Sequence, residues 1–445
     1  MQTATQTTGR PFDAASGDNA ALEQETLRRV SARLLPLLFL MFIAAYLDRT
    51  NVSLAALQMN RDLGLSAAVY GFGSGVFFIG YALFEVPSNL ILARVGARRW
   101  MARIALTWGL LACAMMFVRG PRSFYTVRFF LGIAEAGFFP GIIYYLSNWF
   151  PERRRARAIA GFMVAVPLSS VIGGPMGGAL LSFSGHLGLA GWQWLFLVEG
   201  IPSVILGVVA FLFLTDRPED AAWLSPEQRD WLCAKLEAER TARAHSSETS
   251  LVRALGRGDL WMLTAVYLFG ISALLGTTYF APVMIREAFG MGATGIGLTV
   301  GVLGVVGLIG IVANGAHSDA TGERVLHVTI PMLVVAAGYA LAALVPSPVA
   351  LLAGFALIYL GANAFMPAFW CVPTALLEGT AAAGGIAVIN SIGNLGGFFA
   401  PSLLGALKDR TGAYAGGLLT LGVASIAAAV VVLRFRGHPE RGSLP

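Results

Sequence analysis

The sequence predicts an all-α membrane protein with twelve transmembrane helices in two six-helix halves, and three observations support this fold class. The 445 residues are 56% hydrophobic and only 13% charged, whereas soluble domains contain about 25% charged residues. Apolar runs of about 20 residues, the length that spans a bilayer as a helix, recur along the chain. A charged stretch near the middle divides these runs into six and six. A membrane β-barrel would instead show short segments of alternating polarity.

The predicted spans follow from these runs in order along the chain. Those of the first half cover residues 34–57, 70–92, 100–118, 124–148, 158–182 and 193–215. Those of the second half cover residues 260–283, 293–316, 326–345, 348–371, 382–407 and 413–433. Backbone polar groups inside a bilayer must be paired within the protein, so each run is expected to be helical.

Five segments make up the predicted domain organisation. They are a disordered cytoplasmic tail over residues 1–30, a first half over 31–215, a cytoplasmic central loop over 216–258, a second half over 259–435 and a cytoplasmic tail over 436–445. The first segment is polar and lacks the apolar core of a signal peptide. Within the central loop, residues 228–240 suggest a short surface helix.

An internal repeat supports two homologous halves with the same orientation. A shift of 227 residues places Pro140 on Pro367 and Gly178-Ala179-Leu180 on Gly405-Ala406-Leu407. Such repeats predict that each half crosses the membrane an even number of times. The alternative is chance matching between helices rich in glycine and alanine.

The placement of basic residues predicts the orientation. A cytoplasmic N-terminus puts most of the 31 Lys and Arg residues on the cytoplasmic side, as the positive-inside rule requires. The opposite face holds only Arg61, Arg119, Arg122, Arg286, Lys408 and Arg410. Both termini are therefore expected in the cytoplasm. The net charge of +6 reflects loops that face membrane lipid and does not indicate nucleic-acid binding.

Four charged residues lie inside apolar runs, namely Asp48, Arg49, Arg128 and Glu135. A charge near the bilayer centre costs about 2.5–3.5 kcal/mol, so these side chains are expected to face a wet or protein-lined interior. Helical rise places Asp48 ~21 Å from the cytoplasmic start of its span, and Arg128 and Glu135 ~6 and ~16 Å from the opposite face. All four side chains are therefore expected at similar depths, in the middle and outer half of the membrane. Arg128 and Glu135 share one helix face, whereas Asp48 and Arg49 point ~100° apart.

The charges of this set predict coupling between protons and an anion. With both carboxylates ionised the set is neutral, and an added anion would leave uncompensated charge in a low-dielectric site. Protonation of one carboxylate leaves room for one negative charge, so proton uptake favours anion binding. Arginine holds a carboxylate better than lysine does, through two parallel hydrogen bonds. The alternative is a pair of buried salt bridges that only fix helix packing.

Five motifs carry a family resemblance. They are Tyr46–Asn51 (YLDRTN), Glu85–Asn89 (EVPSN), Arg128–Gly137 (RFFLGIAEAG), Gly191–Phe196 (GWQWLF) and Ile389–Gly397 (INSIGNLGG). With the twelve spans and a Gly-x-Arg loop after spans two and eight, they resemble the anion:cation symporter family of the major facilitator superfamily. The last motif is similar to the bacterial tartrate and phthalate transporter branch.

The resemblance implies a monomeric symporter in the bacterial cytoplasmic membrane that imports a small organic anion with protons as the coupling ion and without another cofactor. It assigns proton coupling to Asp48 and Glu135 and carboxylate binding to Arg49. Arg128 matches a residue that either orients Glu135 or joins the site. Two tyrosines match positions that line the cavity, Tyr46 and Tyr81.

In the second half, polar residues within apolar spans are the candidates for substrate contact. Asn390 and Asn394, four residues apart, share a helix face, and Trp370 lies in the preceding span. Amides in such spans either bond substrate oxygens or join helices. We expect substrate contact for Asn390 and Asn394 and helix packing for Asn363.

Gating is assigned to a second group of residues. The resemblance places the loop motif at Arg94 and Arg98 in the first half and at Asp319 and Arg324 in the second. The superfamily's loop aspartate is replaced by Ala93 in the first half, which puts a charge lock there in doubt. Glu85 is expected to form a gate or interface salt bridge near Arg94 and Arg98, whereas Glu199 is expected to be structural.

Two rival functions remain on the same residues. A proton-driven exporter would have cavity acids without arginines, and a carboxylate sensor would need a signalling domain that the central loop lacks. An enzyme is disfavoured because no nucleophile with a base appears in the spans, and the cysteines have no metal-ligand spacing. The fifth span has Val164, Ala165 and Val166 where sugar-acid transporters of the family place an amide, which favours a compact or aromatic carboxylate.

Overall fold

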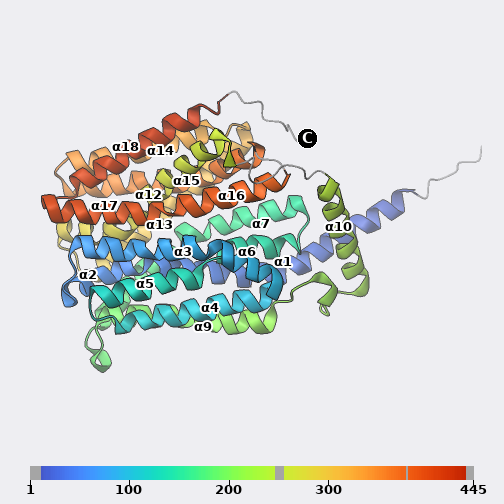
Figure 1. The fold of residues 1–445 in the computed structure, drawn as a ribbon, viewed down its shortest axis with the longest axis horizontal. Helices are drawn as coiled ribbons and strands as arrows, with labels where there is room; N and C mark the ends of the chain where they lie inside the picture. The colour runs from blue at the N-terminus through green and yellow to red at the C-terminus, as the bar shows by residue number, and fades with distance from the viewer. Residues whose placement is uncertain (1–11, 246–254, 377–378, 437–445) are drawn as a thin grey trace, which may run out of the picture.

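The computed structural model describes residues 12–245, 255–376 and 379–436. These residues contain twelve helical segments that are long and apolar enough to cross a membrane and no β-strand, as predicted. The helices of the two halves lie side by side in one bundle (Figure 1). The start of α1 and the end of α18 lie at the same end of this bundle, which we call the terminal end; the opposite end is the far end.

In the first half, several spans are divided into two consecutive helices. The helices are α1 (Phe12–Thr50), α2 (Val52–Asp62), α3 (Ala67–Val95), α4 (Ala97–Ala114), α5 (Pro121–Glu135), α6 (Phe138–Ser147), α7 (Glu152–Met163), α8 (Ala165–Leu180) and α9 (Gly191–Phe213). Single 3-10 turns cover Met115–Phe117, Leu181–Phe183, His186–Gly188 and Pro218–Asp220. The breaks between α1 and α2 and between α5 and α6 directly follow the charged motifs.

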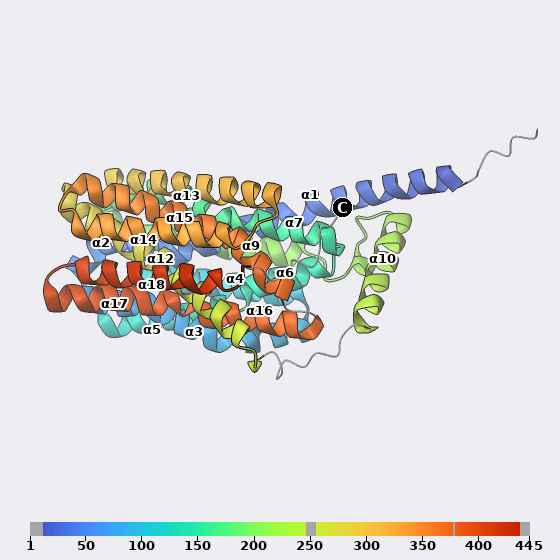
Figure 2. The same ribbon diagram turned by 90° about the horizontal axis from the view of Figure 1, so that it is seen from above.

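The central loop and the second half follow the predicted order. Their helices are α10 (Pro226–His245), α12 (Gly258–Phe289), α13 (Ala293–Thr321), α14 (Leu326–Leu344), α15 (Pro348–Leu376), α16 (Gly379–Asn394), α17 (Gly396–Thr411) and α18 (Ala415–Leu433). Figure 2 shows α10 lying outside the bundle, across its terminal end. This helix confirms the surface helix predicted in the loop.

The predicted disordered tail over residues 1–30 is wrong for residues 12–30, which continue α1 toward its N-terminus. Residues 20–33 contain Ala, Leu, Glu and Arg without Gly or Pro, a composition that favours helix. Leu27 and Val30 are buried, and α1 contacts α10. The polar composition of this segment led to a prediction of disorder, but contacts with the rest of the protein stabilise it as a helix. Residues 1–11 and 437–445 lie outside the described residues.

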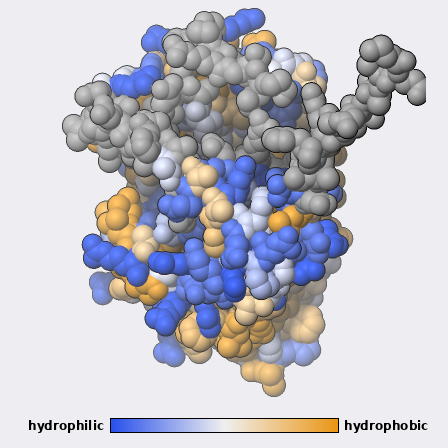
Figure 3. Space-filling view, turned by 90° about the vertical axis from the view of Figure 1, so that its right-hand side faces the viewer, coloured by the Kyte–Doolittle hydropathy of each residue, from blue (hydrophilic) through white to orange (hydrophobic). Residues whose placement is uncertain are grey.

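Polar and apolar side chains are exposed on different parts of the molecule. Figure 3 views the terminal end, where hydrophilic residues gather. Large apolar side chains along the bundle are exposed instead; examples are Leu83, Leu212, Val302, Ile309 and Val423. Exposed apolar side chains are stable where lipid, not water, is the solvent.

The two halves approach each other closely at the far end through glycines. A Cβ on Gly297 of α13 would lie 2.3 Å from the carbonyl oxygen of Gly174 on α8, and one on Gly405 of α17 would lie 2.1 Å from that of Ala67 on α3. Asp409 of α17 also accepts hydrogen bonds from the backbone N–H groups of Ala67 (3.1 Å) and Ala68 (2.9 Å). Small residues allow backbones this close, so the far end is closed.

Replacing Gly297 with alanine is expected to destabilise this closure. Alanine normally favours a helix, but here the new methyl group meets backbone that cannot rotate away, and overpacking costs about 1–3 kcal/mol. The melting temperature in detergent should fall. Gly295→Ala is the matched control, because its Cβ would meet only the Met291 side chain, at 3.7 Å. Equal melting temperatures for the two variants would contradict the close approach.

Candidate functional site

The site is built around a buried ion pair that joins α1 to α5. Arg49, in the last turn of α1, donates from Nη2 to Oε1 of Glu135. The two side chains are 9% and 1% exposed. Glu135 ends α5, and Gly137 then adopts a left-handed conformation (φ 83°) that starts α6 in a new direction. A side chain there would be strained and would collide with Ser88, so this turn requires glycine.

Aromatic rings surround the Arg49 guanidinium. Its carbon lies 4.8 Å from the ring centroid of Tyr46, 5.3 Å from that of Tyr81, 5.4 Å from Phe77 and 5.9 Å from Phe78. Ring faces attract a cation electrostatically, and more strongly where water is excluded. The structure thus brings both predicted tyrosines to Arg49. Phe77 and Phe78 were not predicted as site residues, although Phe77 lies four residues before Tyr81 on the same helix face.

Arg128 also lies next to this aromatic group and is fully buried. Its Nη2 donates to the backbone carbonyl of Ser74 (3.0 Å), and its guanidinium carbon lies 5.0 Å from the Phe77 ring. Nε and Nη1 have no hydrogen-bond partner among the described residues. Glu135 bonds Arg49, and no hydrogen bond joins Arg128 to Glu135 among the described residues. Of the two alternatives for Arg128, this geometry favours joining the site over orienting Glu135.

Asp48 faces away from Arg49, into the interior of the first half. It is buried, and its Oδ2 accepts hydrogen bonds from Trp108 Nε1 (2.9 Å) and Ser203 Oγ (2.5 Å). Neighbouring residues on a helix point ~100° apart, so these two contacts explain why Asp48 and Arg49 face different helices. This arrangement agrees with the expected ~100° separation of the two side chains: Arg49 faces the aromatic rings, and Asp48 faces α4 and α9.

The second half reaches the site through Glu85 on α3. Asn390 of α16 donates from Nδ2 to Glu85 Oε1 (2.6 Å), and the Ser391 hydroxyl donates to Oε2. Asn394 donates back to the backbone and side chain of Asn390 (2.8 and 3.1 Å). The predicted salt bridge of Glu85 with loop arginines is replaced by an amide and a hydroxyl of the other half. Trp370 is on α15, and the centroid of its ring lies 4.9 Å from that of Tyr267 on α12.

The loop motifs differ between the halves. Arg324 donates to Asp319 (2.6 Å) and to Ser318 (2.8 Å), between α13 and α14. In the first half, where Ala93 replaces the aspartate, Asp216 accepts from the backbone N–H of Arg98 (2.8 Å), and the Arg98 side chain donates to a carbonyl of α9 (2.6 Å). Arg94 is exposed at the end of α3.

A small cavity lies between the halves next to the aromatic group. Its walls come from α1, α8, α12 and α15, and its polar lining residues are Tyr46, Thr50, Ser169, Ser170, Thr278, Tyr359 and Asn363. Asn363 donates to the backbone of Tyr359 (2.9 Å) within its own helix, so it lines the cavity as well as packing. The Tyr359 hydroxyl has no hydrogen-bond partner among the described residues. Polar residues within apolar spans were the sequence signal for these positions.

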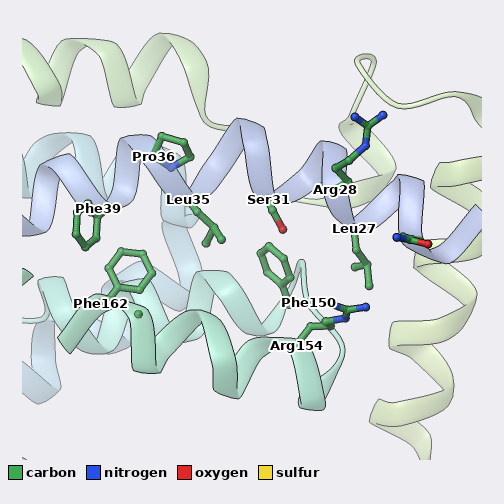
Figure 4. Close-up of a pocket in the computed structure, with 11 residues that line it drawn as sticks. Leu27, Arg28, Ser31, Leu35, Pro36, Phe39, Phe150, Arg154 and Phe162 are labelled. Carbon is green, nitrogen blue, oxygen red and sulfur yellow. The ribbon is translucent and has the colours of Figure 1, made fainter. Parts of the chain in front are cut away.

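A larger groove of about 650 Å³ lies between α1 and the α6–α7 region, near the terminal end. Figure 4 shows Phe39 and Phe162 at one end of it and Arg28 and Arg154 at the other. The predicted site residues do not line this groove. It is therefore separate from the Arg49 site.

Comparisons with known proteins agree with this architecture. The family description Major Facilitator Superfamily matches residues 38–401. A "Putative tartrate transporter" of Agrobacterium vitis is 49% identical over 427 residues, covering 95% of this chain and 98% of that protein. A "Quinolone resistance transporter" of Acinetobacter baumannii is 38% identical, covering 90% and 92%.

Solved structures match the fold as well. The structure described as the partially occluded inward open conformation of the xylose transporter XylE from E. coli matches with a TM-score of 0.71 at 15% identity, covering 91% of this chain and 99% of that one. At this low sequence identity, the match supports only the fold. The family match covers most of the chain, and the relatives match it over nearly its full length. The chain therefore belongs to the Major Facilitator Superfamily and is a membrane transporter, not an enzyme.

Proposed function

We propose that the protein imports an organic carboxylate, of the tartrate or phthalate type, by proton symport with alternating access. The observation that carries this proposal is the buried ion pair between Arg49 and Glu135 inside a group of aromatic rings. A carboxylate of the protein already occupies the guanidinium that a substrate carboxylate would need. Substrate and Glu135 therefore compete for the same hydrogen-bond donors.

A proton decides this competition. When Glu135 is ionised, it holds Arg49 through a charge-assisted hydrogen bond. When Glu135 takes up a proton, Arg49 is left as a buried cation without a counterion, which is costly unless another anion replaces it. The substrate carboxylate supplies that charge, and the free N–H groups of Arg128 offer further donors. Aromatic walls suit a compact or aromatic acid, with Tyr46 and Tyr81 offering hydroxyl groups.

The closed far end supplies one state of the transport cycle. By the positive-inside rule the terminal end would face the cytoplasm, so the hydrogen bonds of Asp409 and the glycine contacts would close the side facing outward. The Glu85 contacts with Asn390 and Ser391 are present together with this closed far end. Separation of α8 from α13 and of α3 from α17 would open the outward side, and separation of Glu85 from α16 would open the cytoplasmic side. Such rocking of two halves about a central site is how repeated transporter folds alternate access.

The relatives support an organic acid as substrate. The 49% identical relative is named for tartrate, whereas the 38% identical one is named for quinolone resistance. The second name keeps export as a rival function on this fold. Two buried arginines favour an anion, because an exporter of cations or zwitterions would gain little from them.

Uptake into proteoliposomes with an imposed proton gradient tests this function. Tartrate, phthalate and galactonate are offered separately, and a fluoroquinolone serves as the export probe. We expect accumulation of tartrate or phthalate above equilibrium, and its loss when an ionophore collapses the gradient. Proton-driven movement of the quinolone with no carboxylate uptake would support the exporter instead. Carboxylate accumulation that an ionophore leaves unchanged would rule out proton symport.

A further inference from the structure

A second pair of carboxylates lies inside the first half, on the side of α1 that faces away from Arg49. Asp48 and Glu199, the latter from the middle of α9, are 1% and 2% exposed. Among the described residues, neither forms an ion pair with Lys, Arg or His. Two ionised carboxylates buried together without a cation would be strongly unfavourable. This pair therefore calls for a bound positive charge.

The hydrogen bonds around the pair identify what is missing. Asp48 Oδ1 and both carboxyl oxygens of Glu199 have no hydrogen-bond partner of normal geometry in the part of the chain that the structure describes. Asn51, at the break between α1 and α2, is 5% exposed and lies against Glu199 as a neutral amide donor, but no hydrogen bond of normal geometry joins its Nδ2 or Oδ1 to a described residue. These groups contain four acceptor oxygens and a single amide donor. Each buried group left unpaired costs about 1–3 kcal/mol.

The groups packed around the pair provide no positive charge. Trp108 on α4 and Ser203 on α9 are neutral donors to Asp48. The other titratable groups that act on Asp48 are Cys113 on α4 and Glu135 on α5, and neither becomes a cation. On the side of α8, Glu199 faces Gly177, where a Cβ would lie 3.6 Å from Oε1. A proton on either carboxyl group removes one negative charge and adds an O–H donor to a set that lacks donors.

The position of Glu199 links this proton to the movement of the halves. Gly177 lies between Gly174 and Gly178, the residues of α8 that contact α13 of the other half at the far end. Separation of α8 from α13 would admit water near Glu199, and water stabilises the ionised carboxylate. Asp48 precedes Arg49 in the chain, so a movement of Arg49 toward a substrate also moves Asp48.

We propose that Glu199 shares an exchangeable, transported proton with Asp48, whose part in proton coupling the family resemblance already implies, and that this carboxyl pair is separate from the Arg49–Glu135 pair. This inference rests on the proposed proton symport and deepens it. The site loads its proton when the far end opens and holds it while the far end is closed. Glu199 thus carries a transported proton and is not only a structural residue.

The first test is an infrared titration of the full chain in detergent, which needs no substrate. Glu199→Gln mimics the protonated side chain and removes the titratable group. We expect the protonated-carboxyl absorption of the wild type to contain a pH-dependent component that Glu199→Gln lacks. Glu227→Gln, an exposed change at the start of α10, is the matched control and should retain the component. Loss in neither variant would overturn the assignment.

The second test measures proton and substrate fluxes together in proteoliposomes. Glu199→Gln should lower the number of protons per substrate by one, while Glu227→Gln leaves it unchanged. An unchanged ratio in Glu199→Gln means that Glu199 is permanently protonated, and the proposal fails. If Glu199→Gln does not fold, Glu199→Asp, which retains a carboxyl group, should keep the ratio but shift the pH dependence of the infrared signal.

The two tests also separate this inference from the proposed function. If the wild type shows no proton-driven uptake, symport itself is wrong, and the infrared titration still decides whether Glu199 exchanges a proton. A sodium ion is the alternative occupant. Substrate uptake that requires sodium in the wild type and loses this requirement in Glu199→Gln would replace the proton by sodium.

Discussion

Replacing Arg49 with lysine is expected to lower the affinity for the carboxylate substrate by about 100-fold or more. Lysine keeps the positive charge but cannot form two parallel hydrogen bonds or stack its planar group among Tyr46, Phe77 and Tyr81. A charge-assisted hydrogen bond is worth roughly 1.5–3 kcal/mol, a cation–π contact about 0.5–2 kcal/mol, and 1.4 kcal/mol corresponds to tenfold in affinity. Equilibrium binding of labelled substrate to the purified protein measures this change.

The matched control for this variant is Arg61→Lys. The Arg61 side chain is 76% exposed at the end of α2, so the same chemical change should leave affinity unaltered. The thermal stability of both variants needs to be measured, because Arg49 also pairs with Glu135 inside the bundle. A folded Arg49→Lys protein with wild-type affinity would remove Arg49 from the role of carboxylate clamp.

Replacing Glu135 with glutamine is expected to separate binding from energy coupling. Glutamine mimics the protonated acid, so it no longer holds Arg49 by charge, and the substrate can bind without prior proton uptake. Exchange of labelled for unlabelled substrate across the membrane should therefore persist. Accumulation driven by a proton gradient should fall well below that of the wild type, because Glu135 no longer carries a proton with the substrate, and the pH dependence of binding should flatten.

Glu227→Gln again provides the control, since it removes a carboxylate that is exposed and outside the bundle. Both activities should survive in it. Undiminished gradient-driven accumulation in Glu135→Gln would move the coupling proton to another residue, with Glu199 and Asp48 as the next positions to examine. Loss of both exchange and accumulation would instead indicate that Glu135 is needed for folding or binding.

The fold class could be predicted almost entirely from the sequence. Length and apolarity of each run are local properties, and a bilayer forces such runs into helices whatever their neighbours are. The surface helix α10 could also be predicted, because its signal is the local residue pattern of the central loop. The segment 12–30 was mispredicted because its helix depends on contacts of Leu27 and Val30 with the rest of the protein.

Most residues that the structure gathers around Arg49 could be singled out from the sequence, but their pairing could not. Charged residues inside apolar spans are rare because their burial is costly, so each one is a candidate for a functional role. Helical geometry correctly separated the directions of Asp48 and Arg49. It could not show that Glu135 pairs with Arg49, because that contact depends on how α5 packs against α1 and on the break at Gly137. The contacts of Glu85 with α16 join residues more than 300 positions apart.

By itself, the sequence determined that this protein is a twelve-span membrane protein with two repeated halves and four buried charges. The reason is that an apolar run long enough to cross a bilayer must form a helix there, whatever its neighbours are. Only the tertiary structure decided which charge meets which. It placed Arg49 among aromatic rings with Glu135, turned Asp48 toward Glu199, and closed the far end. These outcomes depend on the relative rotation and spacing of helices distant in the chain, and hydropathy carries no information about either.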